Sequence, residues 1–274
     1  MKLLSPAKIN LFFRVLYKRI DGFHEVASLM QAISLFDEIY LERSMKDQFS
    51  CTNKHLPTGE ENLVLKGLQV FRKKTGFIDP VAIHLKKNIP TQGGLGGGSS
   101  NCATILFGLS KLSGKNINSD ELSKWAGEIS SDAPFFFSSG TGYATGKGEN
   151  VQSLRPIRKK SFIVAKPVFG LSTPIVYQHC EPNFHSNNPM DLLEKAYSGL
   201  FCGVNDLENP AFKLCPDLVG LKKWLVTNGF KNIAMTGSGT SFYCDPMPLC
   251  PNSNALEFFK VNTVNRAANW YGTY

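Results

Sequence analysis

The sequence predicts a fold that mixes α-helices and β-strands, α+β or α/β, in both halves of the chain. Apolar residues alternate with polar ones over several short stretches, as in strands, and recur at helical spacing in others. Two glycine-rich turns, at 93–98 and 237–239, connect these elements. The 274 residues are enough for one large domain or for two smaller domains around a cleft.

The first half of the chain predicts three strands and a helix before the first glycine-rich turn. Residues 9–15 and 81–85 alternate between apolar and polar side chains, and 38–43 also has the pattern of a strand. Residues 62–74 predict a helix, although Gly67 lowers its intrinsic helix propensity. The glycine-rich turn therefore follows directly on the third strand.

Two helices are expected after the stretch 91–101, which reads Thr-Gln-Gly-Gly-Leu-Gly-Gly-Gly-Ser-Ser-Asn. The first runs over about 103–111. The second runs over 119–129, where apolar residues lie at i, i+3, i+4 and i+7 and Asn118 or Ser119 can cap the N-terminus. The glycines therefore lie between a strand and a helix, which argues against a flexible linker.

A polar and basic segment at 153–160 marks the expected boundary between two domains, 1–155 and 156–274. Beyond it we expect a buried strand at 162–165 and a strand–turn–strand unit at 233–244. Helices are expected at four places: from Thr173-Pro174 onward, and over 192–197, 218–226 and 255–261.

Composition narrows the possible partners and the cellular location. The net charge of +8 favours anionic partners, such as nucleic acid, anionic lipid or phosphorylated small molecules. The basic cluster between Arg155 and Lys160 has no interleaved aromatic residues, so we interpret it as a solvated linker and expect no nucleic-acid partner. No stretch approaches the ~18 apolar residues of a membrane span, and seven cysteines without a C-x-x-C pair fit a reducing compartment. The patterned N-terminus leaves no room for a targeting peptide, so we expect a cytoplasmic protein with no membrane partner.

The stretch 91–101 is the strongest indication of a ligand site. Consecutive glycines let backbone N–H groups turn toward an anion, and the following helix adds the positive end of its dipole. Ser99 and Ser100 can donate to phosphate, and one of them can face a metal ion. The stretch matches neither G-x-x-x-x-G-K-[ST] nor G-x-G-x-x-G, which disfavours P-loop and dinucleotide-binding proteins.

Catalysis requires more than this loop. A helix terminus contributes roughly 0.3–1 kcal/mol per charge, whereas enzymes lower their barriers by ~8 kcal/mol or more. The candidate charged groups are Lys8, on the polar side of the first strand, and Asp132, between the 119–129 helix and Pro134. Taken singly, they are more simply interpreted as a solvated strand lysine and an ordinary turn aspartate.

Four motifs, in order along the chain, together resemble those of the GHMP kinases, which include galactokinase, homoserine kinase, mevalonate kinase and phosphomevalonate kinase. With Phe23-His24, they resemble the branch of that superfamily whose substrate is a cytidyl diphosphate. Phe23 stands where tyrosine is usual, Thr91-Gln92 where smaller residues are common, and Ser131 where alanine is frequent. The four motifs are Pro6-Ala7-Lys8-Ile9-Asn10-Leu11, the stretch 93–101, Asp132-Ala133-Pro134-Phe135-Phe136 and Met235-Thr236-Gly237-Ser238-Gly239.

This resemblance implies a two-lobed GHMP kinase fold with its active site in the cleft. The N-terminal half would resemble domain 2 of ribosomal protein S5, and the C-terminal half would be ferredoxin-like. The resemblance assigns Asp132 to contact the substrate and to accept or orient the proton of the attacking hydroxyl. Lys8 would keep Asp132 ionised and stabilise the developing negative charge.

The same resemblance implies ATP and Mg²⁺ as cofactors and a small cytidyl diphosphate compound as substrate. Phe23 and His24 would bind the cytosine, Asn10 would contact the substrate near the transferred phosphate, and Gly237 and Gly239 would lie near the diphosphate. No metal ligand is assigned, apart from Ser100 as a candidate for Mg²⁺. The residues implied to bind ATP are Pro90, Gly93, Gly94, Leu95, Gly96, Gly97, Gly98, Ser99, Ser100 and Asn101.

Three alternatives remain open. The chain can be another GHMP kinase, acting on homoserine, mevalonate or phosphomevalonate, which the Phe23-His24 pair disfavours. It can be a non-catalytic ATP-binding regulator on the same fold, which the presence of both Lys8 and Asp132 disfavours. It can be a nucleotide-dependent nucleic-acid binder, suggested only by net charge. We expect a monomer or a weak homodimer.

Overall fold

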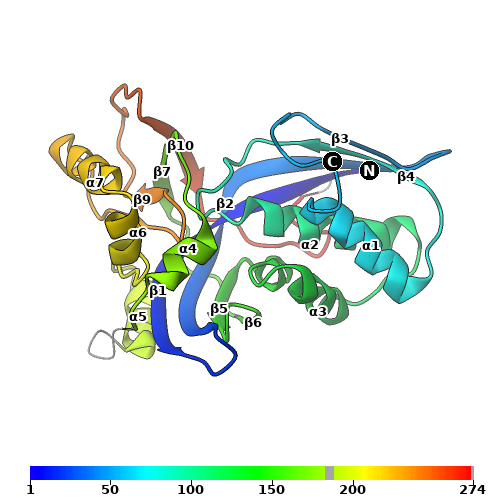
Figure 1. Cartoon of the computed structure of the whole chain (residues 1–274), viewed down its shortest axis with the longest axis horizontal. Helices are drawn as coiled ribbons and strands as arrows, with labels where there is room; N and C mark the ends of the chain where they lie inside the picture. The colour runs from blue at the N-terminus through cyan, green and yellow to red at the C-terminus, as the bar shows by residue number, and fades with distance from the viewer. Residues whose placement is uncertain (183–187, 273–274) are drawn as a thin grey trace.

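Two β-sheets with helices packed against them make up the protein in the computed structural model, which describes residues 1–182 and 188–272 (Figure 1). The first sheet is six-stranded, in the order β3-β4-β2-β5-β6, with β1 paired to β2. All its pairs are antiparallel except β3 with β4. Its strands are β1 (Lys2–Lys18), β2 (His24–Arg43), β3 (Gln48–Cys51), β4 (Val81–Lys86), β5 (Thr141–Thr145) and β6 (Asn150–Ser153).

Helices α1 (Leu63–Thr75), α2 (Gly97–Leu112) and α3 (Ser119–Ile129) cover one face of this sheet (Figure 1). The short 3₁₀ helix η1 (Ala133–Phe137) follows α3. Asn118 is the N-cap of α3, since its side chain accepts a hydrogen bond from the backbone N–H of Glu121. After α3 ends, η1 leads the polypeptide back to the sheet at β5.

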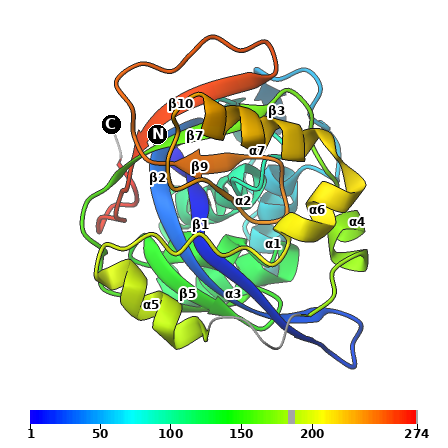
Figure 2. The same cartoon turned by 90° about the vertical axis from the view of Figure 1, so that its left-hand side faces the viewer.

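The second sheet has four strands in the order β10-β7-β9-β8. Its two faces are covered differently: α6 and α7 pack on the side of Ile163 and Ala165, whereas β1 and α5 pack on the side of Phe162 and Val164 (Figure 2). The elements are β7 (Ser161–Pro167), α4 (Thr173–Gln178), α5 (Pro189–Tyr197), α6 (Glu208–Leu214), α7 (Asp217–Thr227), β8 (Ala234–Met235), β9 (Phe242–Cys244) and β10 (Leu256–Asn262).

The long β1–β2 ribbon supports both halves of the molecule. Every residue from Ser5 to Val15 is buried, and so is every residue from Val26 to Ile33. Because both faces of the ribbon are covered, most of its residues lack the alternation that marks a half-exposed strand. For this reason the sequence predicted only 9–15 and 38–43 as strand in this region.

The last described residues return to the first half of the protein. Trp270 is fully buried between Phe107 and Phe137, with its ring 4.8 Å from that of Phe107, and its indole N–H donates to Thr104 at 3.2 Å. The connection 154–160 joins the two sheets, but Trp270 and Tyr271 pack in the core of the first half. The division into domains at residue 155 therefore stays a prediction.

One predicted helical segment is wrong in the structure, and another is confirmed but begins earlier than predicted. Residues 255–261 form most of strand β10, which pairs antiparallel with β7 from Leu256 to Asn262, so tertiary pairing and the β-propensity of Phe258 and Phe259 outweigh the helical pattern. Helix α2 begins at Gly97, earlier than the predicted 103, because Ser100 and Asn101 are buried against β1. No helix in the described residues is long and apolar enough to cross a membrane.

Candidate active site

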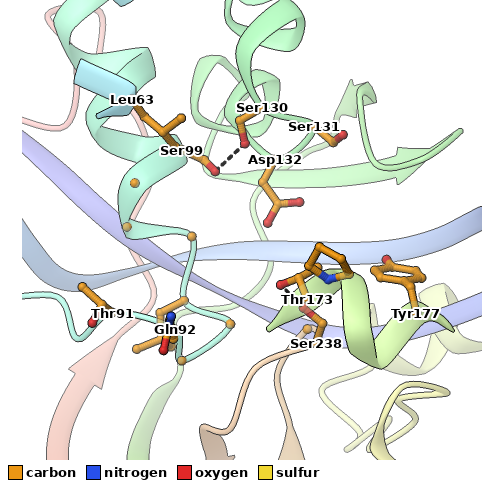
Figure 3. A pocket seen from close by; sticks show the side chains of 18 of the residues that line it. Leu63, Thr91, Gln92, Ser99, Ser130, Ser131, Asp132, Thr173, Tyr177 and Ser238 are labelled. Atoms are coloured by element: carbon orange, nitrogen blue, oxygen red, sulfur yellow. Dashed lines mark hydrogen bonds between the residues drawn. The ribbon is translucent and has the colours of Figure 1, made fainter. Parts of the chain in front are cut away.

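A cavity of about 930 Å³ lies where both glycine-rich turns meet β1, the segment 130–132 after α3, and α4. Figure 3 looks into it: Asp132 points into the space from one side, and Thr173 and Tyr177 approach from α4 on the other. Of the residues predicted to bind ligands or act in catalysis, Asn10, Ser100 and Gly239 do not line it. The predicted residues that do are Lys8, Phe23, His24, Pro90, residues 93–99, Asn101, Asp132 and Gly237.

The first glycine loop turns directly into helix α2. Gly94 and Gly96 have left-handed φ angles of 74° and 68°, a conformation that costs other residues roughly 1–2 kcal/mol. Gly96 is the N-cap of α2, so the first N–H groups of the helix have no partner within it and belong to residues that line the cavity. The backbone N–H of Lys8 donates to the carbonyl of Leu95 at 2.9 Å and anchors the loop to β1.

The second glycine turn interlocks with the first. A Cβ atom on Gly94 would lie 2.1 Å from the carbonyl oxygen of Thr236, and one on Gly239 would lie 2.0 Å from the backbone nitrogen of Gly94. The side chain of Asn205 donates to the carbonyls of Met235 and Gly237, at 2.8 Å each, and holds this turn in place. Gly239 therefore allows the two backbones to lie close together. Asn205 holds the second turn in place, a role that sequence analysis missed.

Lys8 and Asp132 meet beside the glycine loop. The Lys8 ammonium lies 3.1 Å from a carboxylate oxygen of Asp132 and donates to Asn10 Oδ1 at 2.7 Å. The Lys8 side chain is 3% exposed and that of Asp132 is 35% exposed, so the pair has one buried and one accessible member. The interpretation of Lys8 as a solvated lysine on the polar face of a strand is wrong, because α2 and the second glycine turn cover that face.

Asn10 lies behind this pair rather than on the cavity wall. Its side-chain amide donates to Ser28 at 2.8 Å, and its backbone N–H donates to the hydroxyl of Thr236 at 2.9 Å. These bonds fix the orientation of Oδ1, which accepts from Lys8. Asn10 therefore holds the ammonium in place from beneath.

The two loop serines face different ways. Ser99 lines the cavity and shares a hydrogen bond of 2.8 Å with the hydroxyl of Ser130. Ser100 is fully buried and accepts from the hydroxyl of Ser5 at 2.8 Å, so its side chain faces the core instead of a bound metal ion. Ser99 is the loop hydroxyl that can reach a ligand.

The side chains around the cavity can bind Mg²⁺ only if phosphate oxygens supply some of its ligands. Among residues 1–182 and 188–272, no three or more histidine, cysteine or acidic side chains group as a metal site. Mg²⁺ usually takes one or two carboxylates together with substrate phosphates and water. The Asp132 carboxylate and the Ser99 hydroxyl, both on the cavity wall, match that requirement.

A buried carboxylate behind the glycine loop was missed by sequence analysis. Asp37 is fully buried and accepts from the backbone N–H groups of Asn88 and Ile89, at 2.7 and 2.8 Å, and from the side chain of Asn101 at 2.9 Å. It also pairs with the ammonium of Lys87. Burial lowers the pKa of Lys87, and the charge of Asp37 opposes this effect. Asp37 thus connects the chain before the loop to the helix after it.

The far end of the cavity is aromatic. The His24 ring stacks on that of Tyr177, with centroids 5.6 Å apart and planes at 28°, while Phe23 is half exposed under the ammonium of Lys147 at 4.5 Å. Burial and then the charge of Lys18 lower the pKa of His24, which favours the neutral ring. Tyr177 was not predicted, although its spacing of four residues from Thr173 places both on one face of α4.

Comparisons with known proteins agree with this geometry. Residues 62–140 match the model of the GHMP kinases N terminal domain. The 4-diphosphocytidyl-2-C-methyl-D-erythritol kinase of Protochlamydia amoebophila is 45% identical over 277 residues, which span 100% of this chain and 93% of that protein. The chloroplastic kinase of the same name from Arabidopsis thaliana is 43% identical over 99% of this chain and 76% of that protein.

Solved structures of the same class share the fold. A crystal structure of 4-(cytidine 5'-diphospho)-2C-methyl-D-erythritol kinase has a TM-score of 0.80 and 29% identity, over 96% of this chain and 99% of the other. A homoserine kinase from Cytophaga hutchinsonii has a TM-score of 0.68 at 18% identity, over 89% of this chain and 84% of the other, and shows the fold alone.

The fold and the glycine loop define the class as the GHMP kinases, which implies the use of ATP. Within that class, the chain belongs to the 4-diphosphocytidyl-2-C-methyl-D-erythritol kinase family. The two-lobed GHMP fold predicted from sequence is thereby confirmed.

Proposed function

We propose that this protein transfers the γ-phosphate of ATP to the 2-hydroxyl of 4-diphosphocytidyl-2-C-methyl-D-erythritol. The products are the 2-phosphate and ADP, in the non-mevalonate pathway to isoprenoid precursors. The relatives of that name support the substrate. The observation that carries the mechanism is the Lys8–Asp132 pair, 3.1 Å apart, between the start of α2 and the His24–Tyr177 stack.

Phosphoryl transfer needs alignment of the reactants and neutralisation of charge more than covalent chemistry from the protein. In this proposal the N–H groups at the start of α2 hold the ATP phosphates. Asp132 accepts or orients the proton of the attacking hydroxyl, and Lys8 stabilises the charge on the transferred group. Asp132 and Ser99 would hold Mg²⁺, which would supply positive charge to offset the charge of the ATP phosphates.

The other end of the cavity is proposed to hold the substrate. His24, which is buried, and Tyr177, which is partly exposed, offer a flat aromatic surface for the cytosine, and Phe23 can close over it. Gly237 lies beside Lys8, and Ser238 shares a hydrogen bond of 2.7 Å with Thr173 on the helix that carries Tyr177, so the diphosphate would pass along this turn. Asn10 contributes by holding the Lys8 ammonium in place, and Gly239 contributes by letting the second turn pack against the backbone of the first loop.

The test is ADP release with each candidate alcohol in turn. We expect turnover with the cytidyl substrate and none with homoserine, mevalonate or phosphomevalonate. Turnover only with an alcohol that lacks the cytidyl group would refute the substrate, and ATP binding without transfer in a single turnover would indicate a regulator. A cytoplasmic location and a monomer or weak homodimer stay predictions, which cell fractionation and sedimentation can check.

A further inference from the structure

We propose that Ser130 is a positioning residue for ATP binding, which orients the Ser99 hydroxyl toward the phosphates and sets its distance from Asp132. This inference rests on the proposed kinase function. It does not follow from the four sequence motifs, none of which includes Ser130. Figure 3 shows the hydrogen bond that joins the two serines, beside Asp132.

The backbone of Ser130 is held on both sides. Its N–H donates to the carbonyl of Ala126 at 3.0 Å and ends α3, and its carbonyl accepts from the N–H of Ala133 at 3.0 Å. Its side chain makes the third connection, to Ser99 at 2.8 Å. A residue fixed at three points is a rigid support for the hydroxyl that it contacts.

The Ser99 hydroxyl needs such a support because it can rotate. A serine hydroxyl has one hydrogen to donate and two lone pairs, and only one of these three positions is taken by Ser130. The other two are not used by any residue that the structure describes and can serve phosphate or Mg²⁺ at the start of α2, where the helix terminus attracts anions. Holding the hydroxyl in one orientation before ATP arrives removes an entropic cost of binding.

The same bond closes a ring of contacts around the reacting groups. Ser130 lies two residues before Asp132, which pairs with Lys8 at 3.1 Å. Lys8 packs against Gly96, where a Cβ atom would lie 2.9 Å from its Cγ, and Gly96 caps the helix that carries Ser99. Loss of the serine bond would therefore loosen the loop relative to the carboxylate.

The experiment is a double-mutant cycle on the two serines, read as the affinity for a non-hydrolysable ATP analogue. A hydrogen bond of this kind changes an equilibrium about 3- to 10-fold. Ser130→Ala should weaken analogue binding and raise the KM for ATP by about that factor, with the KM for the alcohol unchanged. In a Ser99→Ala background Ser130→Ala should have no further effect, since the residue acts only through Ser99.

Two variants keep the result interpretable. Ser130→Thr retains the hydroxyl and should restore wild-type affinity. Ser123→Ala removes a hydroxyl from α3 at a residue that does not line the cavity, and should change nothing. If Ser130→Ala does not fold, Ser130→Cys, which keeps the size and loses the strong bond, takes its place.

Unchanged analogue affinity in Ser130→Ala, or an equal loss with and without Ser99, would overturn the proposal. Because analogue binding is measured without turnover, its outcome is independent of the substrate. Failure of phosphate transfer to every alcohol would refute the proposed function. The double-mutant cycle would still test the role of Ser130, because it measures only analogue binding.

Discussion

The two ends of the cavity are built in different ways. At the proposed phosphate end the cavity wall is the backbone of one continuous stretch, 93–99, at the start of α2. At the aromatic end it consists of side chains from three segments far apart in sequence: the β1–β2 turn with Phe23 and His24, Lys147 after β5, and Tyr177 on α4.

This difference has a physical basis in what each end is proposed to hold. Phosphate is bound by backbone N–H groups that point toward one site. This arrangement requires a glycine-rich turn followed directly by the N-terminus of a helix. A flat base stacks on aromatic side chains, which can come from any segment that the fold brings to the site. Substitutions should therefore act through backbone geometry at one end and through ring contacts and protonation at the other.

The largest effect is expected between the two ends, at Asp132. Asp132→Asn removes the proton acceptor and should lower kcat by about 10²–10⁴-fold. The analogue of ATP should still bind, because the N–H groups of the glycine loop are unchanged. Steady-state turnover and calorimetric binding measure the two effects separately. Asp120→Asn, at an exposed position on α3, serves as the control, and an active Asp132→Asn enzyme would contradict the assigned role.

Next in size is the interlock of the two glycine turns. Gly94→Ala combines a left-handed φ of 74° with a Cβ only 2.1 Å from the Thr236 carbonyl, so the loop must shift. We expect the KM for ATP to rise at least ~10-fold, a change of about 1.4 kcal/mol. Gly114→Ala has a similar φ of 71° but nothing within 4 Å of the added carbon, so it should cost stability alone. Equal KM values in both variants would refute the backbone interlock.

At the aromatic end, lowering the pH should reduce the free energy of unfolding because of His24. Its pKa lies below the ordinary 6.5, so the unfolded chain takes up the proton first as the pH falls. This contribution to the unfolding free energy is fully present above pH 6.5 and is lost as the pH falls through the lowered pKa. His24→Gln should remove this part of the pH dependence. Urea unfolding at pH 7.5 and 5.5 measures it, with His84→Gln as control; identical losses in wild type and His24→Gln would contradict the prediction.

The smallest effect is expected at Phe23, which is 53% exposed and has the Lys147 ammonium over its ring. Such ring contacts contribute about 0.5–1 kcal/mol at exposed sites. Phe23→Ala should therefore raise the KM for the cytidyl substrate about 2- to 5-fold and leave the KM for ATP unchanged, whereas Phe23→Tyr should retain wild-type values. An increase in the ATP KM would show that the two ends do not act separately.

Sequence analysis was most successful where the information is local. The capped helix after Asn118 and the glycine loop between a strand and a helix were predicted, because caps, spacing and glycine content are read within one turn or two. The prediction that Lys8 and Asp132 act together came from family resemblance. Their separation by more than a hundred residues left no local pattern that could place one beside the other.

Supports that depend on distant partners could not be predicted. Asp37, Asn205 and Ser130 resemble ordinary polar residues in sequence, and each acquires its partners only when remote segments meet. The same reason explains the error at 255–261, where pairing with β7 decided the conformation.

By itself, the sequence determined that a glycine-rich turn leads into a helix at the proposed phosphate end, since glycine content and helical spacing are local features. Only the tertiary structure decided the rest: which serine faces the cavity, which ring lies on His24, and that the Lys8 ammonium is buried 3.1 Å from a carboxylate. The physical reason is that side-chain orientation and burial depend on packing between segments that are distant in the chain.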